Sequence, residues 1–103
     1  MTGYSDRALR IRTFTHAGLR RLYLRDQTRG LPPEAVDTLR KMLAFLQDME
    51  RAEEVRTMPG WRAHQLTGNR QGTWSLRVTG NWRLTFRVRE GELVEVNYED
   101  YHD

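Results

Sequence analysis

Residues 74–86 alternate apolar and polar side chains with period two, which is the pattern of a β-hairpin with one buried face. The apolar positions lie on either side of Thr79-Gly80-Asn81, a typical turn sequence. A two-residue loop would mix the two faces, whereas a three-residue loop places apolar residues opposite one another. The predicted cross-strand pairs are Trp74–Phe86, Leu76–Leu84 and Val78–Trp82, all directed into the core.

The opposite face of this hairpin is cationic. In the same register Arg77 lies directly across from Arg83, and Arg87 follows further along the second strand. Like charges that face each other across two strands destabilise a sheet. We therefore infer that this face binds an anion.

A further strand is predicted by the alternating apolar residues Val94, Val96 and Tyr98. Matching them to the preceding strand pairs Arg87 with Glu95 and Arg83 with Glu99, and places Tyr101 beside Arg83 on the polar face. Carboxylate neighbours weaken the anion-site interpretation of these arginines. For Arg83 and Glu99 the alternative is an ordinary surface ion pair, worth about 0–1 kcal/mol.

The remaining segments complete an α+β layout in the order β-α-α-β-β-β. It is an antiparallel sheet with a two-helix hairpin packed on one face. Alternation at 9–13 predicts the first strand, and residues 55–72 are expected to be an irregular, mobile connection. The first helix is expected to be capped by Thr15, to run to about Thr28 and to stop at Gly30. The second is expected to open at Pro32-Pro33 and to continue to about Ala52.

Length and composition predict one small domain over residues 1–103. The chain has no cysteine, no apolar run of membrane-spanning length and no signal-peptide pattern, so we expect a cytoplasmic protein with no membrane partner. The net charge of +3 is unevenly distributed. Residues 61–89 carry six arginines and no acidic residue, whereas residues 90–103 carry six acidic residues and no basic one. Such segregation favours a localised anion-binding surface.

The motif residues resemble the HigB-type toxins of the RelE/ParE superfamily. The similarity is carried by Gly68-Asn69-Arg70-x-Gly72-x-Trp74-Ser75-x-Arg77-Val78, by Asn81-Trp82-Arg83-Leu84-x-Phe86 and by the terminal Asp100-Tyr101-His102. The resemblance implies a toxin of a type II toxin–antitoxin system, a ribosome-dependent endoribonuclease that cleaves messenger RNA on the 70S ribosome. It also implies a helix-turn-helix, HigA-like antitoxin as partner.

Cleavage of RNA by its own 2′-hydroxyl requires a base, an acid and stabilisation of charge on the phosphate. The resemblance implies His64, Arg83, Tyr101 and His102 as the catalytic residues. In this assignment Arg83 contacts the scissile phosphate, His64 serves as base or acid, Tyr101 stacks or assists proton transfer, and His102 is the general acid. Arg62, Arg70, Arg77 and Arg87 are the predicted RNA-binding residues. Some relatives carry a lysine where this chain has Thr67, which puts part of that chemistry in doubt.

No cofactor or metal is expected, because His16, His64 and His102 are far apart in sequence and form no metal-ligand spacing. Two alternatives stay open. One is a ParE-like inhibitor of DNA gyrase with the same fold, and the other is a non-catalytic module that binds RNA or the ribosome. The group Arg83, Tyr101 and His102 favours the nuclease over both.

Overall fold

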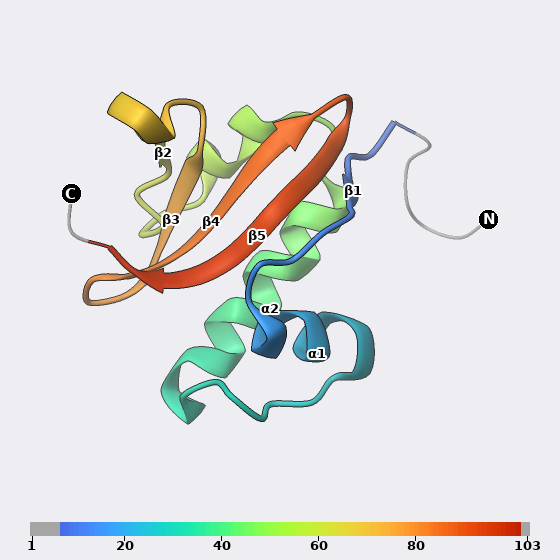
Figure 1. Ribbon diagram of the computed structural model, residues 1–103, viewed down its shortest axis with the longest axis vertical. Helices are drawn as coiled ribbons and strands as arrows, with labels where there is room; N and C mark the ends of the chain where they lie inside the picture. Colours follow the sequence, from blue (N-terminus) through green and yellow to red (C-terminus); the bar gives the residue numbers. More distant parts are fainter. Residues whose placement is uncertain (1–6, 102–103) are drawn as a thin grey trace.

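The computed structural model describes residues 7–101, which form a five-stranded sheet with two α-helices (Figure 1). The strand order is β1-β5-β4-β3-β2, with β1 parallel to β5 and the other neighbours antiparallel. The strands are β1 Arg10–Ile11, β2 His64–Gln65, β3 Trp74–Thr79, β4 Trp82–Arg89 and β5 Glu92–Asp100. The helices are α1 Ala17–Arg25 and α2 Pro33–Asp48, with short 3₁₀ helices η1 Ala52–Thr57 and η2 Gly68–Arg70.

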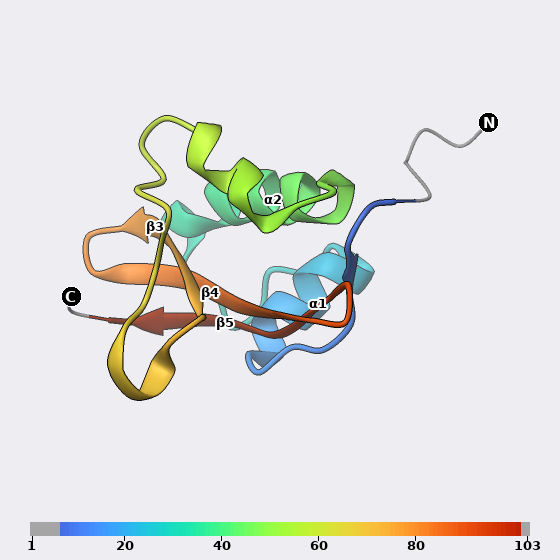
Figure 2. The same cartoon turned by 90° about the horizontal axis from the view of Figure 1, so that it is seen from above.

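The α+β class and the helical pair on one apolar face are confirmed. Figure 2 shows α2 covering one side of the sheet, and Figure 1 shows α1 next to α2 at the lower end of the sheet. Leu19 and Leu22 of α1 and Leu39, Met42, Leu43 and Leu46 of α2 share a core with Trp74, Leu76, Leu84, Phe86, Val96 and Tyr98 of the sheet. On the opposite face, Arg70 of η2 contacts Glu99 of β5, and Ser75 and Thr85 are buried.

The ends of both helices differ from the prediction. The N-cap of α1 is His16 and not Thr15, because the His16 Nδ1 accepts a hydrogen bond from the Leu19 backbone amide at 3.2 Å. The helix ends at Asp26, which adopts left-handed backbone angles well before Gly30. The second helix stops at Asp48, and residues predicted to continue it form η1.

The N-cap makes the stability of the fold depend on pH. Burial, together with the nearby Arg21 charge, lowers the pKa of His16 below its ordinary value. A protonated Nδ1 cannot accept the Leu19 hydrogen bond. The stabilisation is therefore complete above about pH 6.5 and is lost as the pH falls through that value toward the folded-state pKa.

We expect the free energy of unfolding of the wild type to fall by about 1 kcal/mol between pH 7.5 and pH 5.5 through this group. Urea unfolding at the two pH values measures the change. The His16→Asn variant retains a capping oxygen that does not titrate, so its loss over the same range should be smaller by that amount. Equal losses in the two proteins would show that His16 is not the titrating cap.

The hairpin of β3 and β4 has the predicted faces but a shorter loop. The pairs Trp74–Phe86, Leu76–Leu84 and Arg77–Arg83 are confirmed. Val78 is an extra residue in a β-bulge, so Trp82 pairs with Thr79 and not with Val78. Trp82 was predicted to be in the core but is 40% exposed and stacks on Tyr98, with ring centroids 4.7 Å apart.

A second bulge divides the pairing of β4 with β5. At one end Leu84 lies opposite Tyr98 and Arg83 opposite Glu99, as predicted. Beyond Thr85 the register shifts, and Glu95 takes a positive φ of 55°. Arg87 therefore lies opposite Val94, so the predicted Arg87–Glu95 pair is wrong, and Glu95 instead forms an ion pair with Arg89 at 3.5 Å.

The connection between α2 and β3 is more ordered than expected. It contains η1, η2 and the additional edge strand β2, which pairs with β3. Trp61 and Leu66 are both buried, and the Trp61 ring packs edge-on against Phe45 at 5.3 Å. Trp61 is consequently not available as a stacking plane for a base. No α-helix within residues 7–101 has the length and apolar character needed to cross a bilayer.

Candidate functional site

Two arginines converge at the turn between β3 and β4. The Arg83 Nη1 donates to the Gly80 carbonyl at 3.0 Å, and the Arg77 Nε donates to the same oxygen at 3.4 Å. Both side chains are half-buried. Two guanidinium groups that reach one small acceptor are also close enough to share one phosphate, which binds arginine through paired N–H donors.

Beside them lies an ordered ion pair between Arg70 of η2 and Glu99 of β5. The two Nη atoms of Arg70 donate to the two carboxylate oxygens at 2.8 and 2.7 Å, a bidentate geometry. The Thr85 hydroxyl and the Asn97 amide also donate to Glu99. The hydrogen bonds from Arg70 are the main reason why the pKa of Glu99 is lowered, and Glu99 in turn raises the pKa of Arg70.

This pair changes the surroundings predicted for Arg83. Glu99 faces Arg83 across the strands, but its carboxylate oxygens are held by Arg70, Thr85 and Asn97. The sequence contained no signal for the Arg70–Glu99 contact, because the two residues are 29 positions apart and η2 was expected to be irregular. In the described conformation Arg70 binds a carboxylate, so its predicted contact with RNA stays a prediction.

Tyr101 is positioned at the same end of the sheet. Its backbone amide donates to the Asn81 carbonyl at 2.9 Å, which ties the end of the described chain to the β3–β4 turn. The guanidinium carbon of Arg70 lies 5.4 Å from the centre of the Tyr101 ring, within cation–π range. His102 lies outside the described residues.

His64 is placed on the same face by strand β2. His64 pairs with Ser75, Ser75 with Thr85 and Thr85 with Asn97, so these four side chains form a row across the sheet. The neighbouring row contains Arg77, Arg83 and Glu99. Because strands are about 4.8 Å apart, the backbone of His64 lies about 10 Å from β4. The His64 Nδ1 is 2.9 Å from the Arg62 carbonyl, an arrangement that favours the tautomer with the proton on Nδ1 and leaves Nε2 as an acceptor.

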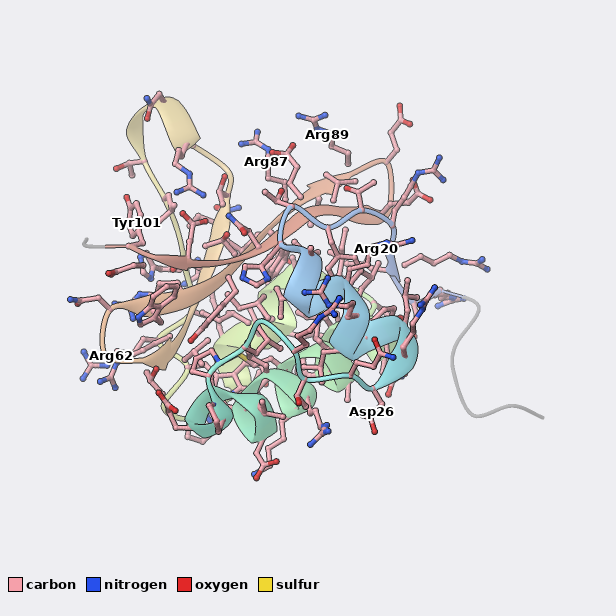
Figure 3. The ribbon with its side chains drawn as sticks, turned by 60° about the horizontal axis from the view of Figure 1, so that its bottom comes forward. Arg20, Asp26, Arg62, Arg87, Arg89 and Tyr101 are labelled. Atoms are coloured by element: carbon pink, nitrogen blue, oxygen red, sulfur yellow. The ribbon has the colours of Figure 1, made fainter. Side chains whose placement is uncertain are left out.

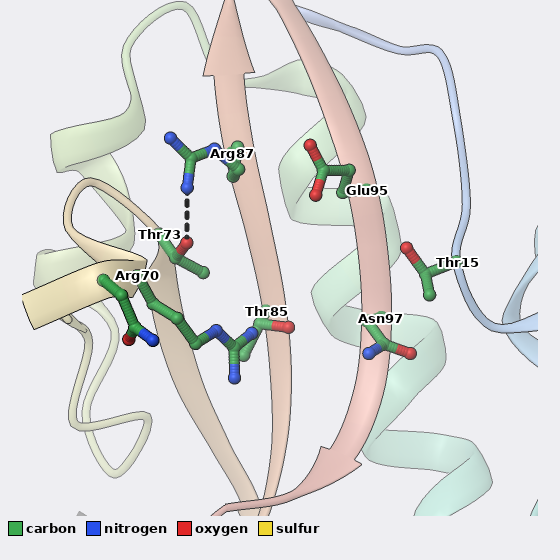
Figure 4. A pocket seen from close by; sticks show the side chains of 8 residues that line it. Thr15, Arg70, Thr73, Thr85, Arg87, Glu95 and Asn97 are labelled. Atoms are coloured by element: carbon green, nitrogen blue, oxygen red, sulfur yellow. Dashed lines mark hydrogen bonds between the residues drawn. The ribbon is translucent and has the colours of Figure 1, made fainter.

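The four predicted RNA-binding arginines do not form one patch. Figure 3 shows Arg62 and Tyr101 toward one end of the sheet, and Arg87 toward the other end with Arg89. Arg77 lies in the group at the turn, opposite Arg83. Arg87 instead borders a cleft of about 300 Å³ on the polar face, shown in Figure 4.

The arrangement can bind a phosphate at Arg77 and Arg83 and place an imidazole and a phenol on the same face. Within residues 7–101, no group of three or more His, Cys, Asp or Glu side chains comes together in a way that could hold a metal ion. The polar face of the described structure presents an imidazole, two converging guanidinium groups and a phenol.

Comparison with known proteins gives a consistent result. A family model described as "RelE-like toxin of type II toxin-antitoxin system HigB" matches residues 12–102. The chain is 37% identical over 92 residues to a Proteus vulgaris protein named Endoribonuclease HigB, covering 89% of this chain and 99% of that protein.

Solved structures share the fold at lower identity. The YoeB–YefM complex from Staphylococcus aureus matches with a TM-score of 0.57 and 18% identity, over 91% of this chain and 99% of that one. The RelBE2 toxin–antitoxin complex from Mycobacterium tuberculosis matches with a TM-score of 0.50 and 21% identity, over the same shares of the two chains. At these identities the likeness establishes the fold alone.

Proposed function

The chain belongs to the HigB family of RelE-like toxins of type II toxin–antitoxin systems, and on that premise we propose that it is an endoribonuclease that cleaves messenger RNA on the translating ribosome. The endoribonuclease activity is supported by the Proteus vulgaris relative, which aligns over nearly its whole length. The observation in this chain that carries the proposal is the convergence of Arg77 and Arg83 on the Gly80 carbonyl, beside Tyr101.

The proposed reaction is attack of a ribose 2′-oxygen on the adjacent phosphorus. The P–O2′ bond forms and the P–O5′ bond breaks, which gives a 2′,3′-cyclic phosphate and a 5′-hydroxyl. Nε2 of His64 removes the 2′-hydroxyl proton, and His102 returns a proton to the leaving O5′. Arg83 stabilises the negative charge that builds on the phosphate, while Tyr101 stacks on a neighbouring base or assists the proton transfer.

Binding of the RNA backbone is assigned to arginines around this centre. Arg77 contributes to the scissile phosphate or the next one, and Arg62 is fully at the surface where it can bind a further phosphate. Dependence on the ribosome is supported by the position of the proposed base, because His64 lies on β2, two strands away from Arg83 on β4. If the ribosome holds the RNA in a reactive geometry, the toxin itself has to position fewer of the reacting groups.

The partners proposed are a helix-turn-helix, HigA-like antitoxin and messenger RNA in the 70S ribosome. Two proteins of the same fold were solved as toxin–antitoxin complexes, which supports an antitoxin partner here. Translation takes place in the cytoplasm, so the proposal locates the chain there. We propose that residues 1–103 act as one domain in these roles.

Inducible expression in a bacterial host tests the proposal. Two reporter transcripts are compared that differ only in the start codon, so that one is translated and the other is not. We expect growth arrest and new 5′ ends inside the translated reporter, at roughly tenfold or greater frequency than in the untranslated one. Primer extension maps the ends.

Each contrary outcome has a distinct meaning. Equal cleavage of the two transcripts would contradict ribosome dependence, and arrest without cleavage would point to inhibition of gyrase. Salt-sensitive RNA binding without arrest or cleavage would indicate a non-catalytic binder. Isolated ribosomes with the purified toxin, with and without EDTA and with ribosome integrity monitored, test the metal-independent chemistry.

A further inference from the structure

Arg87 is a half-buried cation without a carboxylate partner among residues 7–101. Its hydrogen bond in the structure is donated by Nη1 to the neutral Thr73 hydroxyl at 3.1 Å. The bulge at Glu95 is the cause, because it places Val94 opposite Arg87 and leaves Glu95 to pair with Arg89. A partly desolvated charge without a counter-charge is costly unless a ligand compensates it.

The space in front of Arg87 is a polar cleft between β3, β4 and β5 (Figure 4). Its volume of about 300 Å³ is at the lower end of the range for small-ligand sites and is sufficient for one nucleotide unit. The donors on its wall include the Thr73 and Thr15 hydroxyls and the Asn69 amide.

Two carboxylates lie close to this cleft, and both are already neutralised. Glu99, which accepts a hydrogen bond from the cleft residue Thr85, is held by the bidentate contacts from Arg70. Glu95, on its wall, is paired with Arg89. Both carboxylates thus contact other arginines, and Arg87 has no carboxylate contact among residues 7–101, so a ligand can meet its charge.

We propose that this cleft is a second phosphate-binding subsite, in which Arg87 holds a phosphate of the RNA chain that flanks the cleaved position. The inference rests on the proposed function and deepens it. Arg87 and Arg83 lie four residues apart on the same face of β4, a separation of about 13 Å. The Arg87 guanidinium is directed to Thr73, just before β3, and the Arg83 guanidinium to Gly80, just after β3, so the two arginines contact different phosphates of one RNA.

The test compares RNA oligonucleotides of two lengths that carry a 2′-deoxy sugar at the cleaved position and therefore bind without reaction. The short one is a dinucleotide that spans the scissile phosphate, and the long one extends about six nucleotides on either side. Fluorescence anisotropy gives the affinity of each at several salt concentrations. The proteins are the wild type, Arg87→Gln, Arg83→Gln and Arg20→Gln, the last removing the same charge from α1.

For the long oligonucleotide we expect Arg87→Gln to weaken binding about tenfold and to lower the slope of log K against log salt by about 0.7. The dinucleotide should bind this variant and the wild type equally, whereas Arg83→Gln should weaken both. Arg20→Gln should change neither. Circular dichroism checks that each variant is folded.

Three results would overturn the subsite: no effect of Arg87→Gln, an equal effect on both lengths, or an equal effect of Arg20→Gln. Absence of wild-type binding to either oligonucleotide would do so as well. Failure of the proposed function is a separate result, since it is the absence of cleaved messages in the reporter experiment. Length-dependent binding through Arg87 without cleavage would support the subsite in a non-catalytic binder.

Discussion

Replacement of Arg83 by alanine is expected to reduce RNA cleavage by about 10²- to 10³-fold and to abolish growth arrest. The guanidinium lies at the turn where Arg77 also points, and both arginines donate to the Gly80 carbonyl. Its removal leaves the pentacoordinate phosphate without its best-placed cation. The fold should persist, since Arg83 is half-buried and projects from the polar face, away from the core.

The measurement is message cleavage at matched expression of wild type and variant, with primer extension as the readout. Arg83→Lys keeps the charge but loses the planar fork of donors, so it should recover only part of the activity. Arg20→Ala on α1 is the control for loss of one positive charge. Full toxicity of Arg83→Ala at equal protein level would show that the scissile phosphate is bound elsewhere.

Ending the chain after Asp100 is expected to abolish cleavage, because it removes Tyr101 and the general acid assigned to His102. Loss of acid catalysis alone costs about 10²- to 10⁴-fold. The sheet should remain intact, because β5 is paired along its length up to Asp100, which lies opposite Trp82. The hydrogen bond from Tyr101 to Asn81 is the described contact that the truncation removes from the turn.

Single substitutions separate the contribution of Tyr101 to cleavage from that of His102. Tyr101→Phe keeps the ring over Arg70 and tests the hydroxyl alone, whereas His102→Gln tests the acid. Circular dichroism and urea unfolding confirm that each protein is folded. Cleavage retained by the truncated chain in the ribosome assay would refute a catalytic centre at the C-terminal end.

The faces of the strands could be predicted because side-chain alternation is a local property. The residues predicted to face the core are buried, namely Trp74, Leu76, Leu84 and Phe86. The same alternation places Arg77 opposite Arg83 on the other face of the hairpin. The motif residues also carried the family, which the comparison of sequences confirms. The α+β class and the two-helix cover follow from the same periodicities.

The bulges could not be predicted, because an extra residue changes the partner of every position beyond it while the alternation on either side stays intact. One bulge paired Trp82 with Thr79 in place of Val78, and Trp82, predicted to be in the core, is half-exposed and stacks on Tyr98. The other separated Arg87 from Glu95. The start of the first helix was predicted wrongly for a related reason. By residue type His16 is a weaker N-cap than Thr15, but in the fold His16 packs against Tyr98 and caps the helix.

The sequence by itself determined the class of fold, the buried face of the hairpin, the cationic character of the opposite face and the family. Each of these depends on residue type and on spacing along a short segment. The tertiary structure decided that Arg70 pairs with Glu99 and that Arg87 has no carboxylate partner among residues 7–101. That choice depends on contacts between distant segments, above all the bidentate contact of Arg70 with Glu99, and on two bulges that fix the register.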